Sequence, residues 1–471
     1  MAKAIQMIPV SQILLDETIY PRSGVNSRRV NMFVENIQDG FKIDPIELQL
    51  CSDEPGQYRI LDGAHRWHAY REIGSTEISA QIVDLDGMDP LLYAATKAIG
   101  PLQLTEEEAR VTARRAYENN PRLTSQVMGR AIGRSRRTVD GYIADLRATQ
   151  QLDIDIKAYR MNRVGIPQER IAARLGIIQR TVSRHLDYLA ALPNSLNADL
   201  KKGFSITQVA EKHGWPEALV WSIALEGMDD LERFKALMWG LRTWDVWNSN
   251  DCDKRFGDDW PGRIPAQIIA HILYFFSAQG HLVFDPMAGG GVAGDTCLAF
   301  NRKCWSFDME DRPDTRPEIE PHFWDIADLR WPVQGKTKPD LIIFDPPYFT
   351  KKSSQYDSAA ISGMSRGDYL GFLESFFVLA HKNTKKRSQL AMVNADWRDF
   401  QNTPAKDETR RNAVLIDDYL RIINKSGWEH THIIQAPLSS ERFRPHVVAA
   451  MQKRKILGVT SRYVIVAKRR G

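Results

Sequence analysis

The chain has 471 residues, of which 43% are apolar and 26% are charged, and its formal net charge is only +4. This composition argues against a disordered or collagen-like chain, and the length predicts two to four domains at roughly 150 residues each. No stretch reaches the ~20 uncharged apolar residues of a membrane span, and the N-terminus lacks the plan of a signal peptide. The four cysteines form no C-x-x-C pair, which argues against a zinc site or other bound metal and against disulfides, and favours a reducing cytoplasm.

Residues 1–88 alternate short β-like runs with short helices, which predicts a small α+β domain. The segment YRILDGAHRWHAYREIG, residues 58–74, resembles the nucleotide-binding box of the ParB/sulfiredoxin-like superfamily, and GFKIDPIELQL resembles its upstream proline strand. The resemblance implies that Gly63, His65 and Arg66 bind CTP or another nucleotide, with a structural or DNA-positioning role as the alternative. Ala64 stands where sulfiredoxins have a catalytic cysteine and ParB proteins have glutamate, so neither sulfiredoxin chemistry nor CTP hydrolysis is expected.

Residues 89–228 have an almost wholly helical pattern. Three segments, 125–148, 167–190 and 205–225, share one plan of a short helix, a turn with glycine and a second helix. This is the plan of a helix-turn-helix unit, whose second helix enters the major groove of DNA. The middle unit is the clearest, and its second helix would present these residues to DNA: Gln179, Arg180, Ser183 and Arg184. Ordinary helical hairpins are the alternative, above all for the third unit.

The charge of this helical region also favours DNA. Between residues 105 and 190 there are 16 Arg plus Lys and 10 Asp plus Glu, so the local net charge is +6. A basic helical segment is the expected electrostatic footprint of a duplex-binding protein, although a solvated helix face has the same composition.

Residues 229–262 are rich in tryptophan and charge and are expected to form a connector that partly packs on the next domain. From 263 to 471, apolar runs of strand length alternate with helical patterns, which predicts a doubly wound, Rossmann-like α/β sheet. The first of these strands leads into DPMAGGG, residues 285–291, and then into a helix. Consecutive glycines let the backbone approach a ligand closely, and helix-start amides bind carboxylate or phosphate. Asp308 ends the next strand, at a distance that suits a ribose, but G-x-G-x-x-G is absent and NAD is not favoured.

The segment LIIFDPPYFT, residues 341–350, ends a buried strand at Asp345. A strand that ends in an acid places the carboxylate at the carboxyl edge of the sheet, where ligands bind in α/β domains. Residues 263–471 resemble the catalytic domain of S-adenosylmethionine-dependent DNA amino-methyltransferases, which methylate adenine N6 or cytosine N4. Their D-P-P-Y tetrapeptide matches the catalytic residues implied here: Asp345, Pro346, Pro347 and Tyr348.

The same resemblance implies a cofactor site on the glycine loop and the following strand ends. The residues that it assigns to S-adenosylmethionine are Asp285, Pro286, Met287, Gly289, Gly291, Asp308 and Asp325. Met287 replaces the usual Phe of the family loop. The methionine moiety would lie over the loop, the ribose on Asp308 and the cofactor adenine near Asp325.

The chain is therefore expected to have several domains: a ParB-like domain (1–88), a helix-turn-helix region (89–228), a connector (229–262) and a Rossmann-like methyltransferase domain (263–471). The leading hypothesis is a cytoplasmic enzyme that methylates double-stranded DNA, at adenine N6 rather than cytosine N4, in a setting such as restriction–modification. A homodimer is left open. The alternative is a ParB-like partition or regulatory protein whose methyltransferase fold is a scaffold. The catalytic half is expected to fold by itself, because it has its own sheet and its own loop.

Overall fold

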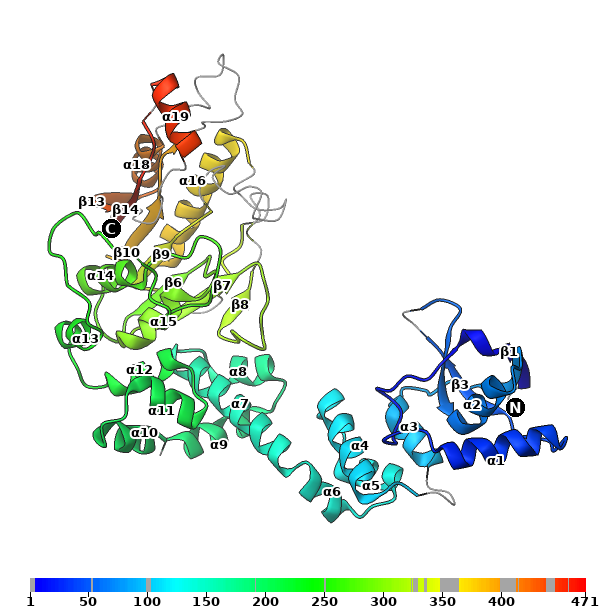
Figure 1. Cartoon of the computed structure of the whole chain (residues 1–471). Helices are drawn as coiled ribbons and strands as arrows, with labels where there is room; N and C mark the ends of the chain where they lie inside the picture. The colour runs from blue at the N-terminus through cyan, green and yellow to red at the C-terminus, as the bar shows by residue number, and fades with distance from the viewer. Residues whose placement is uncertain are drawn as a thin grey trace. The chain divides into compact units, whose positions relative to one another are not determined.

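The computed structural model describes residues 5–51, 54–98, 103–190, 192–249, 251–322, 324, 329–333, 337–347, 364–398, 412–413, 415–437, 445–455 and 457–471. The chain divides into two compact units, Met1–Asp153 and Ile154–Gly471 (Figure 1).

The first unit begins with a mixed five-stranded sheet in the order β1-β5-β3-β4-β2. Its strands are β1 (Ile5–Pro9), β2 (Ile13–Leu14), β3 (Ile46–Leu50), β4 (Tyr58–Asp62) and β5 (Glu77–Ile82). Helix α2 (Ala64–Glu72) packs on this sheet, and α1 (Ser27–Gln38) packs on α2. Ile46 and Leu48 are fully buried two residues apart, as the alternation of a strand with one covered face requires.

Four helices complete the first unit: α3 (Pro90–Lys97), α4 (Glu106–Asn119), α5 (Ser125–Ile132) and α6 (Arg136–Tyr142). Helix α4 begins with a capping box, in which Thr105 and Glu108 each bond the other's backbone N–H. Small residues on one face of α4, Ala109, Ala113 and Ala116, are fully buried against the neighbouring helices.

The second unit begins with a helical layer. Helix α7 (Ala144–Arg163) crosses the division between the units, and five helices follow it: α8 (Gln168–Leu175), α9 (Gln179–Leu189), α10 (Leu192–Lys201), α11 (Ile206–His213) and α12 (Glu217–Ala224). All three predicted helix pairs are present, as α5/α6, α8/α9 and α11/α12. Each pair turns at a glycine, and Gly133, Gly176 and Gly214 have φ of +68°, +64° and +67°. Glycine is the residue that adopts this left-handed conformation at a helix end most readily.

The rest of the second unit is built on a seven-stranded sheet in the order β13-β14-β10-β9-β6-β7-β8. The strands are β6 (Leu282–Asp285), β7 (Lys303–Asp308), β8 (Ile319–Pro321), β9 (Leu341–Phe344), β10 (Gln389–Asn394), β13 (Trp428–Pro437) and β14 (Ser461–Arg469). Strands β8, β7, β6, β9 and β10 are parallel, β14 is antiparallel to them, and the edge strand β13 pairs antiparallel with β14. A separate small pair joins β11 (Trp397–Arg398) to β12 (Asn412–Ala413).

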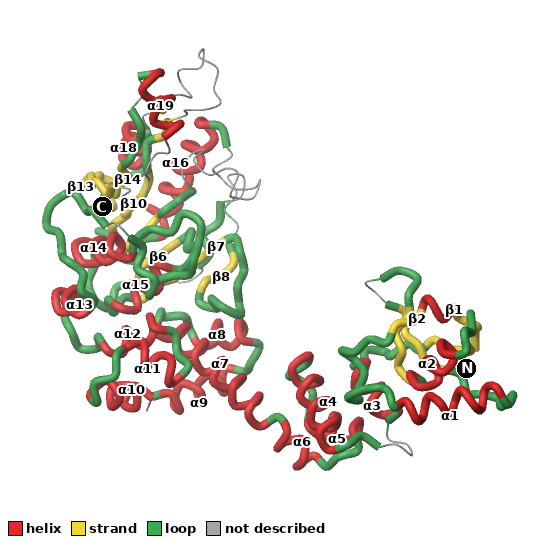
Figure 2. Tube along the Cα trace, in the orientation of Figure 1, coloured by secondary structure: helices red, strands yellow, loops and turns green. Residues whose placement is uncertain are grey.

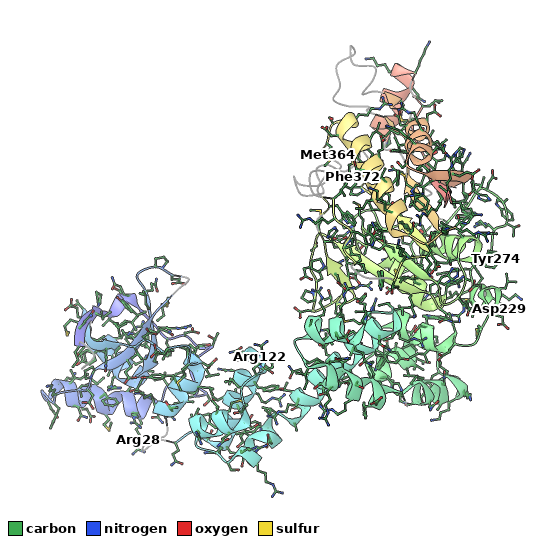
Figure 3. All side chains as sticks on the ribbon, turned by 180° about the vertical axis from the view of Figure 1, so that it is seen from behind. Arg28, Arg122, Asp229, Tyr274, Met364 and Phe372 are labelled. Atoms are coloured by element: carbon green, nitrogen blue, oxygen red, sulfur yellow. The ribbon has the colours of Figure 1, made fainter. Side chains whose placement is uncertain are left out.

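Helices cover both faces of this sheet (Figure 2). One face carries α14 (Ala266–Phe276) and α15 (Val292–Ala299), and the other carries α16 (Arg366–Asn383) and α18 (Ile416–Lys425). Tyr274 and Phe372, labelled in Figure 3, belong to α14 and α16. Because both faces are covered, the central strands are apolar throughout: in β9, Leu341 and Ile343 face one layer, and Ile342 and Phe344 face the other. The doubly wound sheet predicted from the sequence is confirmed. Two further helices belong to this unit, α13 (Asp230–Ala236) and α19 (Pro445–Arg454).

The helical region predicted at 89–228 is divided in the structure, and its second part packs on the domain of the seven-stranded sheet. Helix α12 packs on α15, and Leu298 of α15 is buried in the core of the helical layer. The backbone N–H of Cys304, in β7, donates to the carbonyl of Val164 at 3.0 Å. Residues 154–228 therefore share an apolar core and backbone hydrogen bonds with the sheet domain, which the pattern of the sequence did not reveal.

Within the described part of the chain, no helix has the length and the apolar content needed to cross a membrane.

Candidate functional site

Three carboxylates meet at one edge of the doubly wound sheet. Asp285 ends β6, Asp308 ends the adjacent β7, and Asp345 directly follows β9 on the other side of β6. Strands β6 and β9 are neighbours although the chain forms β7 and β8 between them, so the connections diverge at this point. Such a switch point is where ligands bind in open α/β sheets. The structure thus brings the predicted loop and Asp345, the first residue of the predicted tetrapeptide, to one edge of the sheet.

The acid at the end of β6 is neutral at pH 7. Asp285 is buried, with a relative exposure of 4%, and it accepts a hydrogen bond from the backbone N–H of Met287 at 3.2 Å. Burial and the nearby negative charges of Asp308 and Asp345 raise its pKa from 3.8 to about 8, although the Met287 bond opposes the rise. A cation placed next to Asp285 would therefore favour the ionised carboxylate and make the site more negative.

Side chains from outside the glycine loop form hydrogen bonds with its backbone. The carboxylate of Asp308 accepts from the N–H of Gly289 at 2.8 Å, and Gly291 begins helix α15 with φ of +81°. The carbonyl of Pro286 accepts from the indole of Trp324 at 2.8 Å. Because each carboxylate oxygen has two lone pairs, Asp308 can hold the loop and still accept from a ligand hydroxyl.

The glycines also make room for the connector, whose packing was predicted for the domain as a whole and not for this loop. A Cβ atom on Gly289 would lie 2.9 Å from the ring of Trp260, and one on Gly290 would lie 2.9 Å from the carbonyl oxygen of Asp258. The backbone N–H of Asp258 donates to the carbonyl of Gly290 at 2.8 Å. The connector is therefore one wall of the loop, and the run of glycines is needed for packing within the protein. The only sequence signal was the cluster of tryptophans in this connector.

The predicted catalytic segment follows β9 directly. Pro346 is buried, and the carbonyl of Pro347 lies 3.4 Å from the hydroxyl of Tyr369 on α16. Asn394, at the end of β10, donates to that same hydroxyl at 2.8 Å. The hydrogen-bonded side chains of Asn394 on β10 and Tyr369 on α16 therefore reach the proline pair. Tyr348 and Asp325, which the sequence assigns to base stacking and to the cofactor adenine, lie outside the described residues.

The middle helix pair presents a basic surface and is attached to the sheet domain. Gln179, Arg180 and Arg184 are exposed on α9, whereas Ser183 is partly buried. Within the described ranges neither Arg180 nor Arg184 forms an ion pair. The opposite side of the pair is anchored: Arg170 and Arg174 of α8 pair with Glu320 and Asp311, which lie beyond β7. His185 of α9 bonds Asp155 of α7 at 2.5 Å.

The third helix pair does not offer such a surface. Its second helix, α12, is buried along most of its length, and the buried residues are Ala218, Leu219, Val220, Ser222 and Ile223. The ordinary packed hairpin, which the sequence left as the alternative for this pair, therefore fits the structure.

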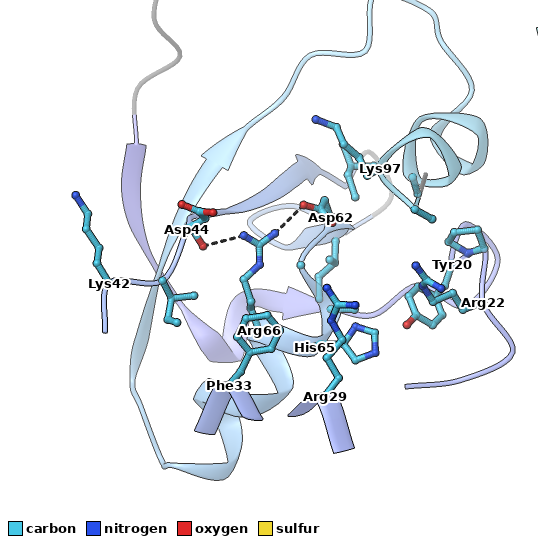
Figure 4. A pocket seen from close by; sticks show the side chains of 18 residues that line it. Tyr20, Arg22, Arg29, Phe33, Lys42, Asp44, Asp62, His65, Arg66 and Lys97 are labelled. Carbon is cyan, nitrogen blue, oxygen red and sulfur yellow. Dashed lines mark hydrogen bonds and ion pairs between the residues drawn. The ribbon is translucent and has the colours of Figure 1, made fainter. Parts of the chain in front are cut away.

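The first unit contains a cavity of about 450 Å³ beside the turn between β4 and α2 (Figure 4). Gly63 makes this turn with φ of +97°, and a Cβ atom there would lie 2.5 Å from the side chain of Ile46. The predicted residues Gly63, His65 and Arg66 all line the cavity, together with Arg29 and Lys42, which the sequence reasoning did not single out. Neither Arg29 nor Lys42 forms an ion pair within the part of the chain that the structure describes.

Two of the predicted side chains make internal contacts in the cavity. Arg66 bonds the carboxylate of Asp62 at 2.6 Å and the carbonyl of Asp44 at 3.0 Å, as the dashed lines of Figure 4 show. His65 accepts from the N–H of Asn26 at 3.1 Å. Burial, with the positive charges of nearby arginines, lowers the pKa of His65 from 6.5 to about 4, so the imidazole is neutral at pH 7. Arg66 and His65 therefore shape the cavity wall.

Comparison with known proteins identifies the N-terminal part of the first unit. Residues 1–97 match the family model described as the ParB N-terminal domain. The nucleoid occlusion protein of Geobacillus sp. (strain WCH70) is 26% identical over 149 residues, which cover 31% of this chain and 51% of that protein. The chain thus spans about half the length of the curated relatives it matches.

Two solved structures are also similar to parts of this chain. The C-terminally truncated chromosome-partitioning protein ParB from Caulobacter crescentus, complexed with CTP-gamma-S, is 19% identical, and the match covers 30% of this chain and 77% of that chain with a TM-score of 0.20. The 1,6-didemethyltoxoflavin-N1-methyltransferase of Burkholderia thailandensis, with bound S-adenosylhomocysteine, is 11% identical, and the match covers 44% of this chain and 76% of that chain with a TM-score of 0.26. The family match over residues 1–97, on a mixed sheet with a glycine turn before α2, identifies this part of the chain as a ParB N-terminal domain.

Proposed function

We propose that the second unit is an S-adenosylmethionine-dependent DNA methyltransferase that acts on an exocyclic base amine, adenine N6 in preference to cytosine N4. The first unit and the exposed face of α9 would locate the target in double-stranded DNA. The observation that carries the proposal is the position of Asp345-Pro346-Pro347 at the switch point of the sheet, beside Asp285 and the glycine loop. The alternative is a ParB-like DNA-binding partition or regulatory protein with a non-catalytic second unit.

The residues at the sheet edge have the donor and acceptor chemistry that S-adenosylmethionine requires. Asp308 offers carboxylate oxygens to ribose hydroxyls, and Asp285 offers a carboxyl group to the cationic methionine end. Helix α15 begins at Gly291, and the free backbone N–H groups of a helix start favour a carboxylate. When bound, S-adenosylmethionine supplies an electrophilic methyl group.

The protein's part in the reaction is to make a poor nucleophile reactive. The lone pair of an exocyclic base amine is delocalised into the ring, so the nitrogen attacks only when it becomes more pyramidal. The carboxylate of Asp345 and the carbonyl of Pro346 would accept the two amine hydrogens and favour that geometry. Because two prolines and the Tyr369–Asn394 contacts hold these acceptors, little reorganisation is needed as positive charge develops on the nitrogen.

The target base has to leave the helical stack to reach this edge. Extruding a base costs a few kcal/mol, and stacking on an aromatic side chain returns about 1–3 kcal/mol per base. Tyr348 is the residue proposed for this stacking. Arg180 and Arg184, on an exposed helix face, are proposed to contact base edges or phosphates, as the second helix of a helix-turn-helix unit does.

The test is incubation of the full chain with S-adenosylmethionine and DNA, followed by digestion of the DNA and mass analysis of its nucleosides. N6-methyladenine is the expected product. Detection of N4-methylcytosine instead would support a DNA methyltransferase whose target is cytosine. If no methylated base is found in duplex DNA, single-stranded DNA or cellular RNA, the result favours the non-catalytic alternative.

Binding of S-adenosylmethionine at pH 7 is expected to release about one proton, because a cation beside Asp285 stabilises its ionised form. The folded-state pKa of about 8 means that most of the unliganded protein has this carboxyl protonated. Calorimetric titrations in two buffers with different ionisation enthalpies measure the proton count. The control is Asp285→Asn, in which the observed enthalpy should become independent of the buffer. Equal enthalpies in both buffers for the unmodified protein would contradict the proposed position of the cofactor.

A second activity is proposed for the cavity of the ParB N-terminal domain, namely binding of a nucleoside triphosphate such as CTP. It is supported by the lining, in which Arg29 and Lys42 are cations without an ion-pair partner in the described part of the chain and Gly63 brings the backbone close. Ala64 supplies no side-chain base, so binding without hydrolysis is proposed.

Replacing Arg29 by Ala is expected to weaken CTP binding about tenfold or more, because a charge-assisted hydrogen bond contributes about 1.5–3 kcal/mol. Calorimetry with CTP on the full chain measures the effect. Arg28→Ala is the matched control, since Arg28 is an exposed neighbour on the same helix that does not line the cavity. If both variants weaken binding equally, general electrostatic attraction explains it and the cavity is not the site.

A further inference from the structure

Two arginines beyond β7 hold the carbonyl groups of the glycine loop. Arg312 donates to the carbonyl of Gly289, and Arg316 donates to the carbonyl of Gly290 at 2.7 Å. Arg316 is buried, with a relative exposure of 3%. Arg312 also lies over the ring of Trp260, with its guanidinium carbon 4.4 Å from the ring centroid. The conformation of the loop thus depends on side chains that lie outside the loop in the sequence.

Arg316 is held in turn by carboxylates from three segments. Its guanidinium contacts Asp258 of the connector at 3.0 Å, Asp295 of α15 at 2.9 Å and Glu318 at 3.2 Å. Arg160 of α7 pairs with Asp295 and, at 2.8 Å, with Glu318. Although burial opposes the ionisation of Asp295, the two arginines hold the pKa of that carboxyl below its ordinary value. Asp295 therefore favours its ionised form beside Arg316, and the contacts from three segments keep Arg316 in one orientation.

The loop needs such external contacts because its own sequence does not select a conformation. Glycine has more accessible backbone conformations than any other residue, and here three follow one another. Gly289 and Gly291 adopt φ of +48° and +81°. Side chains that select this conformation in advance reduce the ordering that a ligand must impose when it binds.

We propose that Arg316 is a positioning residue for the cofactor site: through the carbonyl of Gly290 it holds the loop in the conformation that receives S-adenosylmethionine. It acts on the loop and does not touch the cofactor. This inference rests on the proposed methyltransferase function and adds to it a residue outside the family motifs.

The experiment compares three variants of the full chain: Arg316→Gln, Arg316→Lys and Arg302→Gln. Arg302 is the matched control, because it is another buried arginine of the same sheet domain, and it bonds Asp230 at 2.6 Å and the carbonyl of Phe300 at 2.6 Å, beyond the far end of α15. Three readouts are taken: affinity for S-adenosylmethionine by calorimetry, thermal unfolding, and hydrogen exchange of the backbone amides of residues 288–292.

Arg316→Gln is expected to weaken the affinity about tenfold or more and to speed amide exchange in the loop. Arg302→Gln should lower the unfolding temperature while leaving affinity and loop exchange unchanged. Arg316→Lys should recover much of the thermal stability, because the lysine ammonium still forms ion pairs with Asp295 and Glu318. It should not recover the affinity, because an ammonium lacks the planar fork that reaches Gly290 and Asp258 together.

The proposal is overturned if Arg316→Gln lowers only the unfolding temperature, or if Arg302→Gln weakens the affinity as much. Should Arg316→Gln fail to fold, Asp258→Asn replaces it, since the Asp258 side chain is 44% exposed and its loss leaves Arg316 still paired with Asp295 and Glu318. Faster loop exchange and weaker affinity are then expected, and their absence counts against the proposal. If the unmodified protein binds no S-adenosylmethionine, the proposed function fails, and loop exchange alone decides whether Arg316 positions the loop.

Discussion

Replacing Asp345 by Asn is expected to lower the rate of methyl transfer to DNA by about 10²–10³-fold, because it removes a preorganised acceptor from the reacting amine. The amide has nearly the same size, so the segment between β9 and Pro346 should keep its packing. Affinity for S-adenosylmethionine should change little, since the proposed contact of Asp345 is with the base. Asp345→Ala should have the same effect on the rate. Single-turnover methylation with a labelled methyl group measures the rate, and calorimetry measures the affinity.

The chain offers a matched control on the same strand. Asp340 directly precedes β9 at the opposite edge of the sheet and pairs with Lys385 at 2.8 Å. Asp340→Asn removes an acid from the same strand without approaching the proposed site, and the amide oxygen can still accept the hydrogen bond that the backbone N–H of Leu282 donates to Asp340. Methylation by this variant should equal that of the unmodified protein. If Asp345→Asn retains activity within tenfold, Asp345 is not catalytic.

The second large effect is expected from truncation. A fragment of residues 154–471 should fold and bind S-adenosylmethionine, whereas a fragment of residues 229–471 should melt roughly 6–20 °C lower or fail to fold. The shorter fragment lacks Arg160 and leaves Asp295 and Glu318 with fewer cations in a buried site. Breaking a buried pair costs about 3–5 kcal/mol, and each kcal/mol corresponds to about 2–4 °C in a domain of this size. Loss of the apolar cover over α15 adds to this cost.

Thermal unfolding followed by circular dichroism compares the two fragments, and Arg160→Gln within residues 154–471 isolates the contribution of the ion pair. Equal unfolding temperatures for the two fragments would mean that the helical layer is only an attachment. The longer fragment also tests DNA recognition, because it retains α9 and lacks the ParB N-terminal domain. If Arg180 and Arg184 contact DNA, replacing both by Ala should weaken methylation by this fragment and reduce its dependence on salt.

The sequence by itself determined the local features of this protein. The helix pairs turn at Gly133, Gly176 and Gly214 as their patterns predict, because a left-handed glycine and a change of apolar period are properties of neighbouring residues. The strand ends at Asp285 and Asp345 could likewise be predicted from the sequence, since each acid directly follows a continuous apolar run. The match of residues 1–97 to the ParB N-terminal domain bears out a resemblance carried by two short segments, 40–50 and 58–74.

Only the tertiary structure decided which polar groups serve the candidate site and where the helical region belongs. Arg160 pairs with Asp295 across 135 positions of the chain, and Arg174 pairs with Asp311 across 137. Such pairs have no periodic signature, so a basic helix that holds a catalytic domain has the same composition as one that binds DNA. The same reason applies to Arg316, which in the sequence is one more charge in a polar loop. Its role follows from the fold, because the fold brings three separate carboxylates and the Gly290 carbonyl around one guanidinium.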